Sequence, residues 1–268
     1  MVNISIILCT YNRLKQLKVS IESILTQSFD EYELIVVNDG SSDGTEEYLA
    51  CLSNGEINIK ILNNKSNLGL QKSLNLALQI SSAPLIARID DDDEWLDKNK
   101  LKKQYNEFAL DSNLVLLGTS FEINGEIKNN PIKDSEIRKQ ILFRCPFQHS
   151  TVVFKRKVNN ILISYNEGLV YAEDWELWLR LGQEGTMRNL IECTTKIAHE
   201  NNMSETYFVK QLKGNRRMVF PFLRSYPKAN LAYIYHIFIY FFFTIIPINS
   251  FIHKLFQWIF NFFFKMLN

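Results

Sequence analysis

The sequence predicts an α/β fold in which a mostly parallel central sheet is flanked by helices. Short runs rich in Ile, Leu and Val alternate with segments whose apolar residues recur at helical spacing. Polar turn residues bound these apolar runs, and a polar motif follows three of them. Strand–helix–strand repetition of this kind is typical of βαβ units, whose helices cover both faces of a parallel sheet.

The first part of the chain shows this alternation most clearly. Strands are predicted at 4–9, 33–38, 57–62 and 85–90, and helices at 13–27, 45–53 and 68–81. In the first helix, one apolar face is formed by Leu14, Leu17, Ile21, Ile24 and Leu25. After about residue 113 the pattern is more mixed. Strands are expected there at 114–119 and 150–155, and helices at 134–143 and 173–185.

Three polar motifs follow predicted strands: CTYN after the first, NDGSSDGT after the second and DDDD after the fourth. Ligands of open α/β sheets bind outside the carboxyl ends of the strands. We therefore expect the three motifs to meet at one edge of the sheet, although the chain separates them.

Size and cysteine usage limit the class of protein. A chain of 268 residues suits one large domain, or one domain with an appendage. Its four cysteines include no CxxC pair, which argues against a disulfide framework or a thiolate zinc site and fits a reducing cytosol. The first residues, MVNISIILCTYN, lack the basic region of a signal peptide and are interpreted as a buried strand.

The segment NDGSSDGTEEYL (38–49) resembles a calcium loop at first sight. The twelfth position of such a loop should be a bidentate Glu, and here it is Ala50, so that interpretation fails. Turn and helix-capping chemistry accounts for most of the segment. It does not account for Asp39, whose carboxylate could accept the imide N–H of a uracil.

The segment RIDDDDEW (88–95) places four aspartates together after an apolar run. A solvated loop or a helix start would explain such a run alone. Mg²⁺ and Mn²⁺ prefer hard oxygen ligands, commonly one or two carboxylates plus substrate phosphates. At the end of the fourth strand a divalent-cation site is the favoured interpretation. Arg88 could contact phosphate oxygens or form a salt bridge to the aspartates.

Five segments, in order and at this spacing, give the chain a specific resemblance. They are ILCTYNRLKQLKVSIESILTQ, ELIVVNDGSSDGT, NLGLQKSLNLAL, LIARIDDDDEW and YAEDWELWLRL, and over roughly residues 2–205 the chain resembles family 2 glycosyltransferases with the GT-A fold. The resemblance implies a nucleotide-sugar donor, usually carrying UDP, and Mn²⁺ or Mg²⁺ held by an Asp-x-Asp motif. It also implies a role in bacterial polysaccharide biosynthesis.

The resemblance assigns roles to individual residues. Asp39 matches the carboxylate that reads the base, Asp92 matches a metal ligand, and Asp174 matches the catalytic base of inverting members. His199 matches a histidine that approaches the metal or the diphosphate. The remaining residues implied in donor binding are Thr10, Tyr11, Asn12, Arg13, Asn67, Gly69, Lys72, Arg88, Asp90 and Asp91.

This sequence departs from the family pattern at some positions. Cys9 stands where a proline is common, and Asp91 adds a charge inside the Asp-x-Asp motif, which leaves open which pair binds metal. Glu173 and Asp174 also suit the first turn of a helix, where the dipole stabilises acids by roughly 0.3–1 kcal/mol. His149 is expected to be a packed or hydrogen-bonded residue, and the role of Glu173 stays open.

The end of the chain differs from the rest. Residues 206–268 carry eight Lys and Arg and no acidic residue, and residues 229–252 carry no formal charge. The basic stretch followed by Phe-rich sequence predicts membrane association through residues 209–268. A helix lying in the interface is favoured slightly over one that spans the membrane, and both stay open. Packing on the catalytic domain or on another subunit is the alternative. Nucleic acid is the disfavoured partner of this basic stretch.

These observations predict a GT-A catalytic domain over 1–205 and a membrane-associating helical tail over 206–268. Within the domain, 1–112 would bind the nucleotide-sugar and 113–205 the acceptor. The expected activity is metal-dependent, inverting transfer of a sugar to a glycan acceptor, lipid-linked, at the cytoplasmic face of a bacterial inner membrane. A nucleotidyltransferase and a non-catalytic nucleotide-sugar-binding, membrane-docking protein are the alternatives. The sequence CTYNR has no glycine and so lacks the phosphate loop expected of the former.

Overall fold

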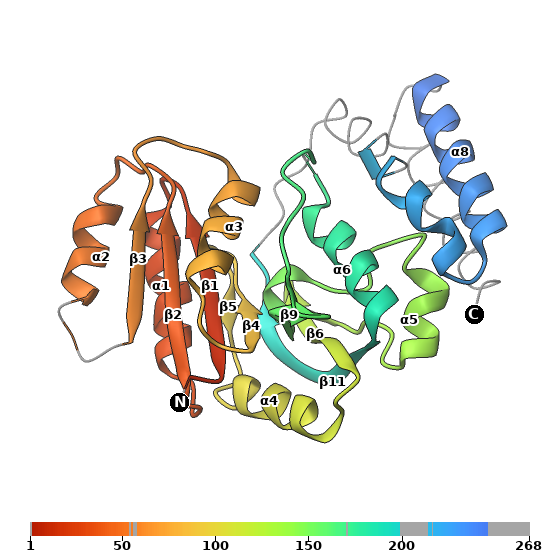
Figure 1. The fold of residues 1–268 in the computed structure, drawn as a ribbon. Coiled ribbons are helices and arrows are strands. Elements are labelled where there is room, and N and C mark those ends of the chain that lie inside the picture. Colours follow the sequence, from red (N-terminus) through yellow and green to blue (C-terminus); the bar gives the residue numbers. More distant parts are fainter. Residues whose placement is uncertain are drawn as a thin grey trace.

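The computed structural model describes residues 2–53, 55, 58–169, 171–198, 214–215 and 217–245, with side chains up to residue 239. Figure 1 shows a sheet that runs through the molecule, with helices on both of its faces. The strands follow the order β3-β2-β1-β4-β8-β6-β11-β5, and β7 pairs with β6 at the side.

The first part of the chain forms the βαβ units that the sequence predicts. Strands β1, β2, β3 and β4 are parallel to one another. The elements are β1 (Ile4–Thr10), α1 (Leu14–Leu25), β2 (Tyr32–Asn38), α2 (Thr45–Ser53), β3 (Ile59–Asn63), α3 (Leu70–Ile80) and β4 (Leu85–Arg88). Every residue of β1 is buried, as expected of a strand covered on both faces.

The second part of the sheet is mixed, so the expectation of a mostly parallel sheet is wrong there. Strand β8 runs antiparallel to both β4 and β6, whereas β11 is parallel to β6. The elements before β8 are β5 (Glu94–Trp95), α4 (Lys100–Leu110), β6 (Leu114–Ile123), β7 (Glu126–Lys128), α5 (Asp134–Gln140) and η1 (His149–Thr151). The rest are β8 (Val153–Lys155), β9 (Lys157–Val158), β10 (Ile161–Leu162), α6 (Glu173–Glu184) and β11 (Thr186–Lys196).

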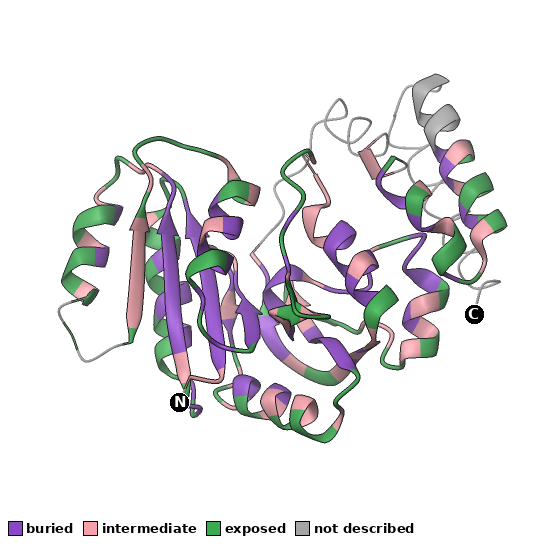
Figure 2. Ribbon diagram, in the orientation of Figure 1, coloured by how far each residue is buried: buried purple, intermediate pink, exposed green. Residues whose placement is uncertain are grey.

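The side chains of the central strands alternate between two hydrophobic cores. Ile6 and Leu8 pack with helix α1, whereas Ile7 and Cys9 pack with α3 and α6. Figure 2 shows β1 and β2 as the buried layer between the helices. This double burial fixes the ends of the strands relative to one another.

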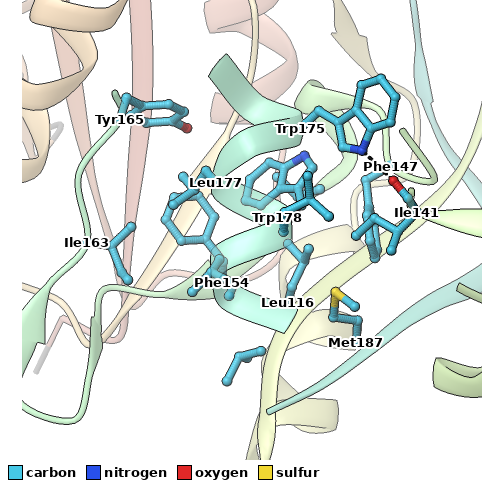
Figure 3. Close-up of a cluster of buried hydrophobic side chains, with 14 of the residues drawn as sticks. Leu116, Ile141, Phe147, Phe154, Ile163, Tyr165, Trp175, Leu177, Trp178 and Met187 are labelled. Carbon is cyan, nitrogen blue, oxygen red and sulfur yellow. Dashed lines mark hydrogen bonds between the residues drawn. The ribbon is translucent and has the colours of Figure 1, made fainter. Parts of the chain in front are cut away.

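Trp178 of α6 lies at the centre of the second core (Figure 3). Its ring makes edge contacts with Phe154 and Phe147, at centroid distances of 5.3 and 6.3 Å. Nearby, the Trp175 indole Nε1 donates to the Ile141 carbonyl at 2.7 Å. These contacts hold α6 against the sheet, with the first turn of the helix directed to the site described below.

The described part of the predicted tail contains η2 (Phe220–Ser225) and α8 (Ala229–Ile245). It packs on α5 and α6: the Tyr226 hydroxyl donates to the Leu179 carbonyl at 2.6 Å, and His236 Nε2 lies 2.6 Å from the Leu142 carbonyl. This part therefore adopts the packing alternative named from the sequence. In the described part of the chain, no helix combines the length and hydropathy needed to cross a membrane. Expectations for residues 206–213 and 246–268 lie outside the described residues.

The Trp178→Ala substitution is expected to lower the free energy of unfolding by about 3–5 kcal/mol, because it leaves a cavity in the core that holds α6. Urea denaturation followed by circular dichroism measures the change. Ile191→Ala, at a side chain that is 64% exposed, is the matched control and should stay within about 0.5 kcal/mol of the wild type. A loss under about 1 kcal/mol for Trp178→Ala would show that α6 is held by other contacts.

Candidate active site

The loop after β1 is tied to the loop after β2 by side-chain and backbone hydrogen bonds. Asn12 has a positive φ of 53°, a conformation that Asn adopts more readily than most residues. The backbone N–H of Asn12 donates to Ser41 Oγ at 2.9 Å, and its side-chain Oδ1 accepts from the backbone N–H of Ser42 at 2.8 Å. Asn12 is therefore a loop-fixing residue, while Tyr11 beside it exposes 46% of its surface.

Asp39 is held at the end of β2 by backbone N–H groups. Its carboxylate accepts from the N–H groups of Leu68 and Gly69 at 2.9 and 3.0 Å, and from Asn64 Nδ2 at 2.8 Å. Gly40, which follows it, has a φ of +77°, and a Cβ there would lie 2.7 Å from the backbone of Ser66. The backbone thus brings Asp39 against the segment that begins α3.

The four-aspartate loop divides its carboxylates between two arginines and the protein interior. Arg13 Nη1 lies 2.7 Å from Asp92 Oδ2 and 3.2 Å from Asp91 Oδ1. Arg88 Nη2 lies 2.5 Å from Asp90 Oδ1. Asp93 turns inward, where Ser150 Oγ and the Ala198 N–H donate to its carboxylate. Only part of the cluster is therefore a solvated loop.

The buried Arg88 sets the charge balance of this loop. Burial has the largest single effect on Asp90 and disfavours its ionised form, but Arg88 and the other neighbouring groups together outweigh burial and lower the pKa of Asp90 overall. Burial raises the pKa of Asp91, and burial together with Asp90 raises the pKa of Asp93 to about 7. Arg88 also donates to the carbonyl oxygens of Ile7 and Ile89. It lies beneath the site with only 1% of its surface exposed, so it forms the salt bridge foreseen as an alternative to phosphate contact.

Glu173 and Asp174 begin helix α6. Gln71 Nε2 of α3 donates to Glu173 Oε2 at 3.4 Å, and burial raises the pKa of Glu173. Asp174 Oδ1 accepts from the Trp175 N–H at 2.7 Å. Burial, and then the negative charge of Glu173, raises the pKa of Asp174 to about 7. A carboxylate with this pKa is suited to accept a proton near neutral pH.

These elements enclose a pocket with a volume of about 720 Å³ at the carboxyl ends of β1, β2 and β4. The predicted convergence of the three motifs is therefore found in space. The lining comprises Cys9, Thr10, Tyr11, Arg13, Asp39, Asn67, Gly69, Leu70, Ser73, Asp90, Asp91, Asp92 and Glu173.

Some predicted residues are not in this lining. Asn12 and Arg88 support it from outside, as described above. Lys72 is exposed on α3, and Asp174 lies next to the lining residue Glu173. His199 lies outside the described residues.

Asp91 and Asp92 are the carboxylates of the pocket best placed to bind a divalent cation. Asp91 and Asp92 converge on one cationic atom, Arg13 Nη1, and the side chain of Asp92 is 32% exposed. Within the described ranges, no group of three or more His, Cys, Asp or Glu could hold a metal by itself. The pair therefore fits Mg²⁺ or Mn²⁺ whose coordination is completed by substrate oxygens and water.

His149 is a packed residue, as expected from the sequence. Its Nε2 lies 2.9 Å from the Tyr165 hydroxyl, and its ring contacts Trp178 at a centroid distance of 6.1 Å. Burial, and then the charge of Arg88, lowers the pKa of His149 to about 3, so the ring is neutral at physiological pH.

Sequence reasoning missed Ser150 and Gln71. The Asp90 N–H donates to Ser150 Oγ at 2.9 Å, so Ser150 binds the four-aspartate loop at two points, Asp90 and Asp93. Gln71 positions Glu173, as described. Neither residue belongs to a polar motif at a strand end, and single polar residues in a loop or a helix carry no local signal of such contacts.

The sequence was compared with protein families and with known proteins. A model of the family described as "Glycosyl transferase family 2" matches residues 5–164. An uncharacterized glycosyltransferase of Haemophilus influenzae is 32% identical over 76% of this chain and 68% of its own length. The UDP-Glc:alpha-D-GlcNAc-diphosphoundecaprenol beta-1,3-glucosyltransferase WfgD of Escherichia coli is 29% identical over 86% of this chain and 90% of its own length.

The fold was compared with solved structures. The crystal structure of S. aureus TarS 1-349 in complex with UDP-GlcNAc is similar with a TM-score of 0.66 at 20% sequence identity. The match covers 86% of this chain and 69% of that one. The likeness confirms the expected GT-A-type α/β fold, here with a mixed sheet. Since the family match spans more than half of the chain and includes the three polar motifs that follow β1, β2 and β4, the protein belongs to glycosyltransferase family 2.

Proposed function

We propose that this glycosyltransferase is metal-dependent and inverting, and that it transfers a sugar from a UDP-sugar to a hydroxyl group of a lipid-linked glycan in bacterial surface polysaccharide (O-antigen or capsule) synthesis. The observation that carries the proposal is the single pocket that gathers Tyr11, Asp39, the four-aspartate loop and Glu173. Membership of the family favours glycosyl transfer over nucleotidyl transfer and over a non-catalytic role.

The donor base would bind between Tyr11 and Asp39. The Asp39 carboxylate already accepts three hydrogen bonds, and a carboxylate offers about four acceptor positions. One position thus stays available for the imide N–H of uracil, and the exposed Tyr11 ring offers a surface on which the base can stack. UDP-Glc in the name of WfgD and UDP-GlcNAc in the TarS complex support this choice.

Asp91 and Asp92 would hold the divalent cation, and Arg13 would contact the diphosphate. When bound, the cation supplies Lewis-acid stabilisation of the negative charge that develops on the leaving UDP. Asn67 and Gly69 line the pocket just before α3.

Asp174 would act as the general base. It takes the proton of the acceptor hydroxyl while that oxygen attacks the anomeric carbon. The bond from this carbon to the diphosphate breaks on the opposite face, and UDP leaves with the bonding electrons. A base for inversion must lie on the side of the sugar away from the diphosphate. Asp174 lies next to the lining residue Glu173, at the edge of the pocket in which the donor would bind.

The relatives and helix α8 support the proposed acceptor and location. WfgD is named for a diphosphoundecaprenol-linked acceptor, which supports a lipid-linked acceptor here. Residues 113–205 would form the acceptor side, after the donor half 1–112, and the protein would act at the cytoplasmic face of the inner membrane. Helix α8 exposes Leu231 and Ile234, at 42% and 62% of their surfaces. The preceding basic residues would add roughly 1 kcal/mol each near anionic lipid.

Asp174→Asn should lower kcat by about 10²–10⁴-fold while UDP binding is retained, because Asn cannot accept the proton. A carboxyl group whose pKa is raised to about 7 is neutral below that pH and ionised above it. The wild-type kcat/KM should therefore rise as the pH increases through about 7, and this rise should be absent in the variant. UDP release from candidate donors, with membrane extract as acceptor, measures both.

The matched control for Asp174→Asn is Glu184→Gln at the exposed end of α6, which should retain wild-type kcat. If Asp174→Asn transfers sugar at nearly the wild-type rate, Asp174 is not the general base.

Excess chelator should abolish transfer, and added Mn²⁺ or Mg²⁺ should restore it, because the pocket holds carboxylates suited to one hard cation. Asp92→Asn should lower kcat/KM by about 10²-fold or more at saturating Mn²⁺. Asp97→Asn, at a carboxylate that pairs with Lys103 outside the pocket, should retain activity. Undiminished transfer in chelator would rule out metal dependence.

The double variant Leu231→Glu/Ile234→Glu should lose most of its co-flotation with vesicles that contain phosphatidylglycerol, because both side chains lie on the exposed surface of α8. Leu110→Glu on α4, at a side chain that is 82% exposed, is the matched control and should float like the wild type. Unchanged flotation of the double variant would exclude this part of α8 from membrane binding.

A further inference from the structure

The two pocket carboxylates that fit a divalent cation are already paired with a positive charge. Arg13 Nη1 contacts Asp92 Oδ2 and Asp91 Oδ1 at 2.7 and 3.2 Å, so a single nitrogen lies between both groups. All three residues belong to the lining of the pocket. The guanidinium therefore occupies the region on which the two carboxylates converge.

A divalent cation and Arg13 would compete for these oxygens. Mg²⁺ binds carboxylate oxygens at about 2.0–2.1 Å and demands near-ideal octahedral geometry. A guanidinium N–H on the same oxygen would bring a third positive charge into direct contact with the cation's ligands. Binding of the cation therefore requires that Arg13 gives up its charge-assisted hydrogen bonds to Asp91 and Asp92.

Hydrogen bonds hold the backbone around Arg13, whereas its side chain is half exposed. The Arg13 carbonyl accepts from the Leu17 N–H at 2.9 Å, and the Leu14 N–H donates to Asp43 Oδ2 at 2.9 Å. The side chain is 49% exposed and lies along the pocket. Rotation of the side chain alone can therefore transfer the guanidinium to another anion in the same pocket.

A donor diphosphate would supply that anion. The planar guanidinium matches phosphate oxygens in a bidentate manner, so Arg13 can replace the lost carboxylate contacts when the donor is present. Without the donor, the cation must displace Arg13 with no new partner for the guanidinium. The same displacement is offset when the donor binds together with the cation.

We propose that Arg13 is an exchange residue: it takes the place of the divalent cation on Asp91 and Asp92 in the free protein and moves to the donor diphosphate when the cation binds. This proposal rests on the proposed donor and cation. Arg13 then couples the two ligands, so that each raises the affinity of the protein for the other, by the same factor in both directions. In the pocket without metal or donor, the charge of Arg13 offsets part of the negative charge of Asp91 and Asp92.

The test is the Kd of Mn²⁺, measured by isothermal titration calorimetry and by the electron paramagnetic resonance of free Mn²⁺, with and without saturating UDP. Arg13→Gln removes the competing charge, and Lys15→Gln is the matched control. Lys15 is exposed on α1 and lies outside the pocket lining. Its substitution by Gln removes one positive charge, as Arg13→Gln does. Asp92→Asn reports whether Mn²⁺ binds at this site.

Arg13→Gln is expected to bind Mn²⁺ about 10-fold more tightly than the wild type when UDP is absent, a factor within the usual range of coupling between sites. The ratio of the Kd without UDP to the Kd with UDP should shrink by a similar factor. Lys15→Gln should follow the wild type in both measurements. Asp92→Asn should lose Mn²⁺ binding with and without UDP.

The proposed exchange of Arg13 is rejected if Arg13→Gln binds Mn²⁺ no more tightly than Lys15→Gln in the absence of UDP. If the wild type then still binds Mn²⁺ with UDP and Asp92→Asn does not, the cation site of the proposed function stands without the exchange. If the wild type binds no Mn²⁺ even with UDP, the cation site and the exchange are both rejected.

Discussion

Two arginines make a dense group of carboxylates compatible with a folded protein. Arg88 lies beneath the four-aspartate loop and pairs with Asp90, while Arg13 lies above it and pairs with Asp91 and Asp92. Without these charges, like-charged side chains at one edge of the sheet would repel one another in a partly buried site. The two arginines differ in one respect that matters for function: Arg88 is enclosed by protein, whereas the side chain of Arg13 is half exposed. A permanent counter-charge thus lies below the loop and an exchangeable one lies above it.

The parallel half of the sheet brings these charges together. Strands β1, β2 and β4 end at the same edge, so residues near positions 11, 39 and 91 meet although the chain separates them. Local backbone chemistry then fixes each loop, through the left-handed turn at Asn12 and the glycine at position 40. Helix α6, which packs on the mixed half of the sheet, adds Glu173 and Asp174. Because α6 is held by the Trp178 core, the packing of that core and the position of the proposed base are linked.

Much of the donor side could be predicted from sequence, because strands buried on both faces give continuous apolar runs and their ends mark the site. The mixed half of the sheet was harder to predict. Strand β11 alternates irregularly between buried and exposed residues and has no clean period, and the direction of β8 depends on contacts with β4 and β6. Side-chain direction was also beyond reach. Arg88 turns into the protein, Lys72 is absent from the pocket lining, and Glu173 rather than Asp174 belongs to that lining. Each of these outcomes depends on tertiary packing, which a local pattern does not encode.

The central claim is that one pocket holds a nucleotide diphosphate and a cation between Asp39 and the four-aspartate loop. A crystal structure of the protein soaked with UDP and Mn²⁺ tests it most directly. The account predicts the uracil ring beside Tyr11 and Asp39, with the diphosphate and the cation next to Asp92. Nucleotide density elsewhere on the molecule, with Asp39 and Asp92 both free of ligand, would contradict it.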